Sequence, residues 1–467
     1  MKRCKITLCL IVLALSMTFA ASCSSGTKDS SMLMNEAKFS EDGKPVVTIG
    51  TVGFTDEMFL SKNKTARPKD IIVEIVNYSD GVDKDLPVNE QERIIRQKID
   101  SDFISGNAPD IMIADSEEIY RLNRLGILTD LYQLMEQYDG IKKDDFTDCA
   151  LEGLTIDGKM PAILENYYIR TAAAKTEFVG KEYENWTAAD AMRFFGTTAE
   201  NQDFCEYFDE SSLADYMLKL EGINCVDLKN NSCNFGGAFT ELLDFCKKNP
   251  IQVRSFEYAE DFDELKQKER QCYGLNDAFL VYEIPINSFS SGLASGTFGY
   301  LNEADLTFVG YPSENGCGAY VTPAINNGLI GICSQSSNKE AAWELLNKMI
   351  QHRVRPEKSA HSDVMGIPVF KSEWEYYYDL TEDHNSSINS KIYTYDGSRD
   401  TATYITQEYK DMLRDYILSV PVNPYTPRSL EYIIEEECDP VIIDNRSAEE
   451  AASIMQNRIE TYLSEKD

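Results

Sequence analysis

The chain has 467 residues, and its 45 Lys and Arg against 78 Asp and Glu give a net charge of −33 at pH 7. Such a charge repels phosphate groups, which excludes nucleic-acid binding through a broad basic face and disfavours adhesion of the folded domain to anionic lipid. The hydrophobic share of 43% and aromatic share of 11% are typical of a folded globular protein, not of a disordered acidic tail. The three histidines are too few for a His-rich metal site, and no cofactor is expected.

The N-terminal segment predicts an exported, lipid-anchored protein. Three basic residues lie within the first five positions, and residues 6–19 form an apolar run of about 14 residues, too short to span a bilayer. Small residues then precede Cys23, an arrangement that resembles the lipobox of bacterial lipoproteins. The resemblance implies a signal peptide over residues 1–22, lipid on Cys23, and a flexible leash over residues 23–44 on the extracytoplasmic side of the cell membrane. The alternative is an ordinary signal peptide with an incidental cysteine.

Removal of the signal peptide also changes the charge and the cysteine count. The net charge becomes −36, and nine cysteines follow Cys23. An odd number at irregular spacing does not describe a disulfide framework, and no CxxC pair is present for zinc. We expect most of these thiols to be small buried apolar groups, with a bridge between Cys225 and Cys233 left open.

The first part of the chain alternates between strands and helices. Residues 46–49 and 71–76 predict two β-branched strands, and a helix over residues 90–104 should end at Gly106. A short buried strand at residues 111–113 precedes a helix that begins at residues 115–118 and ends before Gly126. This order favours an α/β unit with a mainly parallel sheet.

The later part of the chain is less regular. Residues 184–248 are expected to be mostly helical, with Trp186 in the core, and residues 384–403 are expected to form a loop. Capping boxes predict helices after Ser337 and Ser447, and Trp343 should lie on the buried face of the first of these. Strands are expected in three further segments: 278–286, 306–309 and 329–332.

Motifs spread across the chain give a family resemblance. Four pairs or runs carry it: residues 105–111 with 126–131, residues 157–161, residues 311–316 with 337–343, and residues 447–452 with 462–465. Together with the lipobox, they resemble the family 1 extracellular solute-binding proteins of bacterial carbohydrate ABC importers, similar to maltose- and oligosaccharide-binding proteins. The resemblance implies the two-lobed, type II periplasmic-binding-protein-like α/β fold, in which each lobe is a sheet flanked by helices and hinge crossings join the lobes.

The resemblance also implies boundaries and partners. Residues 45–163 with 311–355 would form lobe 1, and residues 164–310 with 356–467 would form lobe 2. The expected partners are a carbohydrate ligand, the permease subunits of an ABC transporter, and the membrane through the N-terminal lipid. The protein is expected to be a monomer.

Nine residues are predicted to line the solute cleft: Phe54, Asp115, Glu117, Glu165, Tyr167, Tyr168, Tyr282, Glu283 and Trp374. Carboxylates accept charge-assisted hydrogen bonds from sugar hydroxyls, and aromatic rings pack on the apolar faces of sugar rings. Phe54, Asp115 and Glu117 follow predicted strands, at the carboxyl ends where open α/β sheets bind ligands. The family resemblance places Glu165, Tyr167 and Tyr168 just past the crossing to the second lobe. It also implies an aromatic ligand contact after the strand that precedes Tyr282 and Glu283, whereas Trp374 is a candidate because it belongs to an aromatic cluster after residues 366–368.

Five of these residues also have a simpler interpretation. Asp115 has the sequence of a helix N-cap. Glu165 is equally well explained as a solvated hinge acid, and Tyr167, Tyr168 and Trp374 as core residues. These alternatives stay open on the sequence alone.

The sequence favours capture of a solute without chemistry. It has no HExxH, GxSxG or GxGxxG motif, so no catalytic residue is assigned and the protein is not expected to be an enzyme. The net charge suits an uncharged sugar better than an acidic one. The alternatives are another solute, such as a peptide or polyamine, and a lipid-anchored glycoside hydrolase with paired carboxylates.

Overall fold

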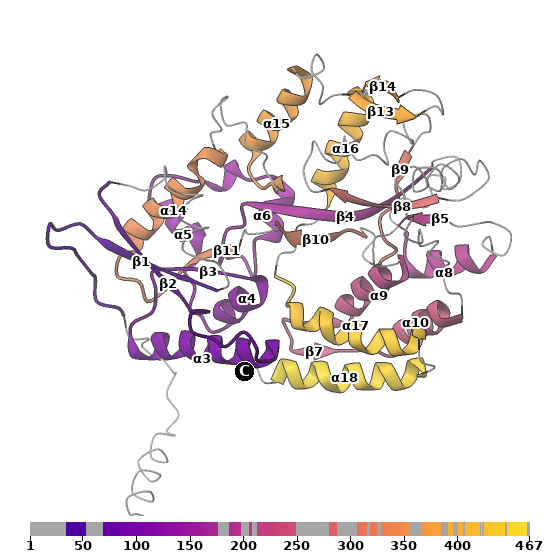
Figure 1. Cartoon of the computed structure of the whole chain (residues 1–467), viewed down its shortest axis with the longest axis horizontal. Coiled ribbons are helices and arrows are strands. Elements are labelled where there is room, and N and C mark those ends of the chain that lie inside the picture. The colour runs from indigo at the N-terminus through magenta and orange to yellow at the C-terminus, as the bar shows by residue number, and fades with distance from the viewer. Residues whose placement is uncertain are drawn as a thin grey trace, which may run out of the picture.

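The computed structural model describes sixteen parts of the chain. These are residues 34–52, 69–175, 186–197, 205–207, 213–248, 280–286, 306–314, 318–324, 328–354, 366–383, 391–395, 400–404, 407–420, 422, 425–443 and 446–464. Within them the helices and strands form two α/β lobes side by side, joined by the long strand β4 (Asn166–Lys175) (Figure 1).

The first sheet has four strands in the order β11-β3-β1-β2. They are β1 (Val46–Thr51), β2 (Ile72–Asn77), β3 (Ile111–Ala114) and β11 (Leu329–Ile332). The strands β1, β2 and β3 run parallel, as the sequence predicted, and β11 is antiparallel to β3. The central strands are buried along their length, whereas the edge strand β2 alternates between exposed and partly buried residues.

Helices pack around this sheet to form lobe 1. They are α3 (Val88–Ser105), α4 (Ser116–Arg124), α5 (Leu131–Gln137), α6 (Asp148–Gly153) and α14 (Lys339–Val354), with the 3₁₀ turn η1 (Lys143–Asp145). The predicted end of α3 is confirmed, because Gly106 adopts the left-handed conformation (φ 75°) that a glycine cap provides. Trp343 of α14 is 1% exposed and lies in this core, as expected.

The second sheet is built around β4. Its other strands are β5 (Cys205–Tyr207), β8 (Leu280–Ile286), β9 (Leu306–Phe308), β10 (Tyr320–Pro323) and β12 (Ile367–Pro368). Every described partner of β4 is antiparallel to it, and only the β5–β8 pair is parallel. The mainly parallel order expected from the first elements therefore does not extend to this sheet, because its strands come from distant segments that return to β4.

Helices on this sheet form lobe 2 with a core of its own. They are α8 (Ala188–Thr197), α9 (Leu213–Asn224), α10 (Ala238–Lys248), α17 (Arg428–Ile443) and α18 (Ala448–Ser464), with the short pair β6 (Val226–Asp227) and β7 (Ser232–Cys233). Trp186 is 2% exposed in this core, as predicted. The strand β4 connects the two cores, since Tyr167 and Ile169 lie in the first and Ala172 in the second.

Two helices and a hairpin complete the described chain. The helices α15 (Lys371–Asp383) and α16 (Gln407–Ser419) bury Trp374 and Ile417 in the first core. Between them, β13 (Lys391–Tyr395) pairs with β14 (Asp400–Tyr404). The expectation of a loop was wrong for residues 391–395 and 400–403, and the rest of the range 384–403 lies outside the described residues. In the sequence, alternating β-branched and aromatic residues flank an Asp-Gly turn sequence there.

The two capping boxes predicted from the sequence have different outcomes. The Ser447 hydroxyl accepts from the N–H of Glu450 at 3.1 Å, which confirms that half of the predicted capping box. The helix predicted after Ser337 is confirmed as α14, which begins at Lys339, but the described contacts of Ser337 show a bond from its hydroxyl to the carbonyl of Asn35 and none to Glu340. Cys225, directly before β6, and Cys233 of β7 are free thiols, and the bridge left open between them does not form. In the described part of the chain, no helix is both long and apolar enough to cross a membrane.

Candidate functional site

The carboxylate of Glu117 lies where the two lobes meet. Glu117 is in the first turn of α4, and Ser429 is in the first turn of α17. The Oε2 atom of Glu117 accepts from the Ser429 N–H at 3.0 Å, and the Ser429 hydroxyl lies 2.8 and 2.7 Å from the two carboxylate oxygens. Arg96 of α3 adds a hydrogen bond to Oε1 at 2.7 Å. Glu117 is thus only 5% exposed, and its charge is compensated from both lobes.

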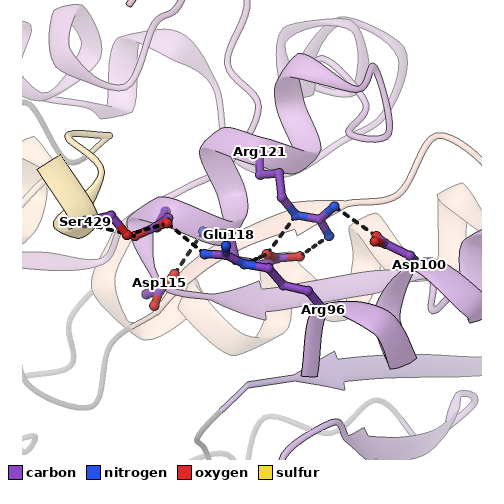
Figure 2. Close-up of polar contacts among 7 residues, drawn as sticks. Arg96, Asp100, Asp115, Glu118, Arg121 and Ser429 are labelled. Carbon is purple, nitrogen blue, oxygen red and sulfur yellow. Dashed lines mark hydrogen bonds and ion pairs between the residues drawn. The ribbon is translucent and has the colours of Figure 1, made fainter. Parts of the chain in front are cut away.

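The other charges of this network stay within lobe 1 (Figure 2). Arg121 donates to Glu118 at 2.7 Å and pairs with Asp100 at 2.9 Å, while Arg96 lies 3.8 Å from Glu118. Burial alone would lower the pKa of the Arg96 and Arg121 guanidinium groups. The adjacent carboxylates raise it by more, so the pKa of each group lies above its ordinary value and both stay charged.

Asp115 is the N-cap of α4. Its Oδ1 atom accepts from the N–H of Glu118 at 2.9 Å, and its backbone is extended (φ −70°, ψ 176°), as at a helix cap. The side chain of Asp115 therefore makes the bond of a helix N-cap, which is the simpler of its two interpretations from the sequence.

Two more contacts connect the lobes beside Glu117. The hydroxyl of Tyr120 on α4 donates to the carbonyl of Leu228 at 3.3 Å, and Leu228 packs against both cores. The ammonium of Lys229 lies 2.6 Å from the carboxylate of Asp157, and both side chains are largely exposed. The exposed pair contributes little stability, whereas the contacts of Glu117 are buried.

The hinge strand β4 presents different residues on its two faces. Tyr167 is fully buried with its hydroxyl beside the thiol of Cys149, and burial raises the pKa of this tyrosine. Tyr168 and Glu165 are each 8% exposed, and within the described residues the Tyr168 hydroxyl has no hydrogen-bond partner. A buried hydroxyl without a partner costs free energy, so a polar group supplied by a solute would be favourable at this position.

Aromatic residues of lobe 2 lie on the face of β4 opposite Tyr167. Arg170 donates to the hydroxyl of Tyr216 at 3.0 Å, and the Tyr216 ring stacks on Tyr311 with centroids 4.5 Å apart. Since residues 167 and 170 differ by an odd number, their side chains point to opposite faces of the strand. Tyr320 of β10 pairs with Arg170 across the sheet and extends the aromatic group.

A polar network anchors this aromatic group to α17. The hydroxyl of Tyr320 donates to Glu431 at 2.5 Å, and the Lys219 ammonium lies 5.2 Å from the Tyr320 ring centroid and 2.5 Å from Glu435. Burial raises the pKa of Glu431, and the hydrogen bond from Tyr320 and the charge of Lys219 oppose the shift. The sequence reasoning missed these residues, and the only signal was the total of 26 tyrosines.

Trp374 lines a cavity of about 370 Å³ on the Tyr167 side of β4. The cavity is lined by Thr147, Asp148, Cys149, Lys371, Trp374, Glu375, Tyr378, Arg414 and Leu418. Trp374 is 4% exposed, and Cys149 of this lining is also the neighbour of Tyr167. Trp374 and Glu117 therefore lie in separate surroundings, and the structure does not bring them into one site.

Comparison with solved structures identifies the fold. The sugar-binding protein MalE from Xanthomonas citri aligns with a TM-score of 0.52 and 14% identity, over 90% of this chain and 98% of that one. The chain has the two-lobed fold of a periplasmic solute-binding protein. A family 1 extracellular solute-binding protein from Alicyclobacillus acidocaldarius aligns over 90% and 98% of the two chains at a TM-score of 0.48 and 16% identity, and the assignment does not depend on it. No family model and no curated protein matches the sequence.

The fold confirms the α/β architecture expected from the motifs, and the predicted site residues lie in different parts of it. Glu117 lies at the lobe contact, Glu165 directly precedes the crossing strand β4, and Tyr168 lies in that strand. Tyr282 and Glu283 lie in β8, opposite Ala173 and Ala172 of β4, but their side chains fall outside the described residues. Phe54 also falls outside them. Among the described residues, no group of three His, Cys, Asp or Glu side chains could hold a metal ion.

Proposed function

We propose that the protein is the substrate-binding lipoprotein of an ABC transporter, which captures a sugar or oligosaccharide between its lobes and delivers it to the membrane permease. The observation that carries this proposal is the two-lobed fold itself, with β4 as a crossing and polar contacts where the lobes meet. The similar X. citri protein is described as sugar-binding, which supports a carbohydrate as the solute.

The chemistry at the crossing suits hydroxyl-rich ligands. Glu165 supplies a carboxylate, Tyr168 a buried hydroxyl with no described partner, and Arg170 an exposed cation beside the tyrosine group. Carboxylates and tyrosines bind sugar hydroxyls and ring faces by hydrogen bonding and stacking, and they need no cofactor. Tyr282 and Glu283 of β8, and Phe54, which follows β1 in the sequence, stay in the proposed set as solute contacts.

The proposal includes how the protein is held and divided. Cleavage after residue 22 and lipid on Cys23 would place the lobes at the extracytoplasmic face of the membrane as a monomer. The motifs imply residues 45–163 with 311–355 for lobe 1 and residues 164–310 with 356–467 for lobe 2. In the structure these bounds do not follow the two cores everywhere, because Tyr311 and Tyr320 pack with the second core and Trp374 with the first. The protein would perform no chemistry, since closure around the solute is driven by the higher affinity of the closed form.

A thermal-shift screen tests this function. A sugar present at 100 times its dissociation constant should raise the free energy of unfolding by about 2.7 kcal/mol. The E165A variant should lose most of this shift, whereas E152A, an exposed acid on α6, should keep it. Stabilisation by peptides or polyamines but by no sugar would refute the carbohydrate assignment. Release of smaller sugars during incubation with an oligosaccharide would show a hydrolase instead.

A further inference from the structure

Glu117 uses its hydrogen-bonding capacity on the protein itself. Its two oxygens receive Arg96 from its own lobe, and the hydroxyl and N–H of Ser429 from the other lobe. The Ser429 N–H belongs to the first turn of α17, where N–H groups lack acceptors within the helix. A carboxylate at this end of a 16-residue helix is also favoured by the helix dipole.

The neighbouring acids do not share this arrangement. Glu118 is equally buried on the same turn of α4, but its described partners, Arg121 and Arg96, belong to lobe 1. Asp115 bonds within its own helix. Of these three adjacent acids, Glu117 is thus the one whose described bonds join the lobes.

We propose that Glu117, oriented by Arg96, is a latch that holds the lobes together before any solute enters. It is a positioning residue for capture and does not contact the solute. This role rests on the proposed solute-binding function. Because the fraction of closed protein scales the apparent affinity, breaking the latch should weaken binding without removing a solute contact.

The test compares E117A with E118A in the full mature chain without solute. Both variants remove one buried carboxylate from the same turn, so a charge or stability effect should be common to them. Hydrogen exchange at the Ser429 amide should accelerate roughly tenfold or more in E117A and stay unchanged in E118A. Small-angle scattering should show a larger radius of gyration for E117A alone. S429A, which loses one of the two bonds from lobe 2, should fall between the wild type and E117A.

Three outcomes would overturn the latch. The first is wild-type exchange and radius in E117A. The second is the same change in E118A, which would indicate a general loss of stability. The third is a loss of sugar binding in E117A with an unchanged solute-free protein, which would make Glu117 a solute contact. If E117A does not fold, exchange and scattering of S429A decide, and wild-type values for it refute the latch. Failure of every sugar in the thermal screen would leave these solute-free measurements intact, so the two proposals fail separately.

Discussion

Replacement of Asp115 separates its two predicted roles, helix cap and solute contact. In the structure its carboxylate accepts from the N–H of Glu118 at 2.9 Å at the start of the nine-residue helix α4. The change to Ala removes this acceptor and a negative charge from the N-terminal end of the helix. The change to Asn keeps an acceptor of the same size and removes only the charge.

The structure sets the expected size of each effect. Loss of an N-cap acceptor costs about 1 kcal/mol, and loss of a charge beside a helix N-terminus costs about 0.3–1 kcal/mol. D115A should therefore lower the free energy of unfolding by about 1–2 kcal/mol, and D115N by less than about 1 kcal/mol. For a folding unit of roughly 150–250 residues, 1 kcal/mol corresponds to about 2–4 °C in melting temperature.

Urea unfolding measures these differences as shifts of the midpoint at a constant m-value. Sugar-induced stabilisation, measured on the same variants, tests the second role. If Asp115 is only a cap, D115N loses less than about 1 kcal/mol of stability and keeps its full response to sugar. A D115N protein that is stable but no longer responds to sugar would refute this reasoning and assign Asp115 to the solute. A D115A protein as stable as the wild type would show that the cap contributes nothing.

Three further predictions concern other parts of the chain. W343F should lower the free energy of unfolding by about 2 kcal/mol or more, because Trp343 is 1% exposed and its indole N–H donates to the carbonyl of Asp139 at 3.0 Å. Urea unfolding measures this loss, and a value well below about 2 kcal/mol would contradict the packing of Trp343. Burial raises the pKa of Glu431, so the native state holds this proton more tightly and stability falls as pH rises from the ordinary Glu range through the raised value. The stability of E431Q relative to wild type should rise over that window in a pH series of urea midpoints, and a flat difference would contradict the shift. Burial raises the pKa of Cys225 to about 12 and of Cys233 to about 11. Iodoacetamide at pH 8 should therefore alkylate them only after unfolding, as followed by mass spectrometry, and alkylation of the native protein as fast as a free thiol would contradict this.

The features predicted correctly from the sequence depend on neighbouring residues. The glycine that ends α3 and the aspartate that caps α4 act through backbone groups within four positions. The burial of Trp343 follows from the apolar face of the single helix α14, and Trp186 is buried two positions before α8 begins. Such chemistry is complete within a short window, so a sequence pattern is enough to find it.

The features missed depend on distant segments. The stack of Tyr216 on Tyr311 joins a helix to a segment 95 positions later. The sequence around these two residues does not distinguish them from the other tyrosines of the chain. The antiparallel order around β4 depends on strands from residues 280–368, and no local pattern states which strand will pair with which. The motif resemblance gave the two-lobed fold because it spans the whole chain, which local patterns do not.

Glu117 shows why the site was harder to predict than the fold. With 78 acids in the chain, a carboxylate after a strand is weak evidence for a ligand contact. What determines its role is Ser429, which is 312 positions away and meets it only when the lobes lie together. In an open arrangement the same carboxylate would lose both bonds from Ser429. Its role is therefore a property of the hinge equilibrium, and measurements on the solute-free protein can assign it where a binding assay alone cannot.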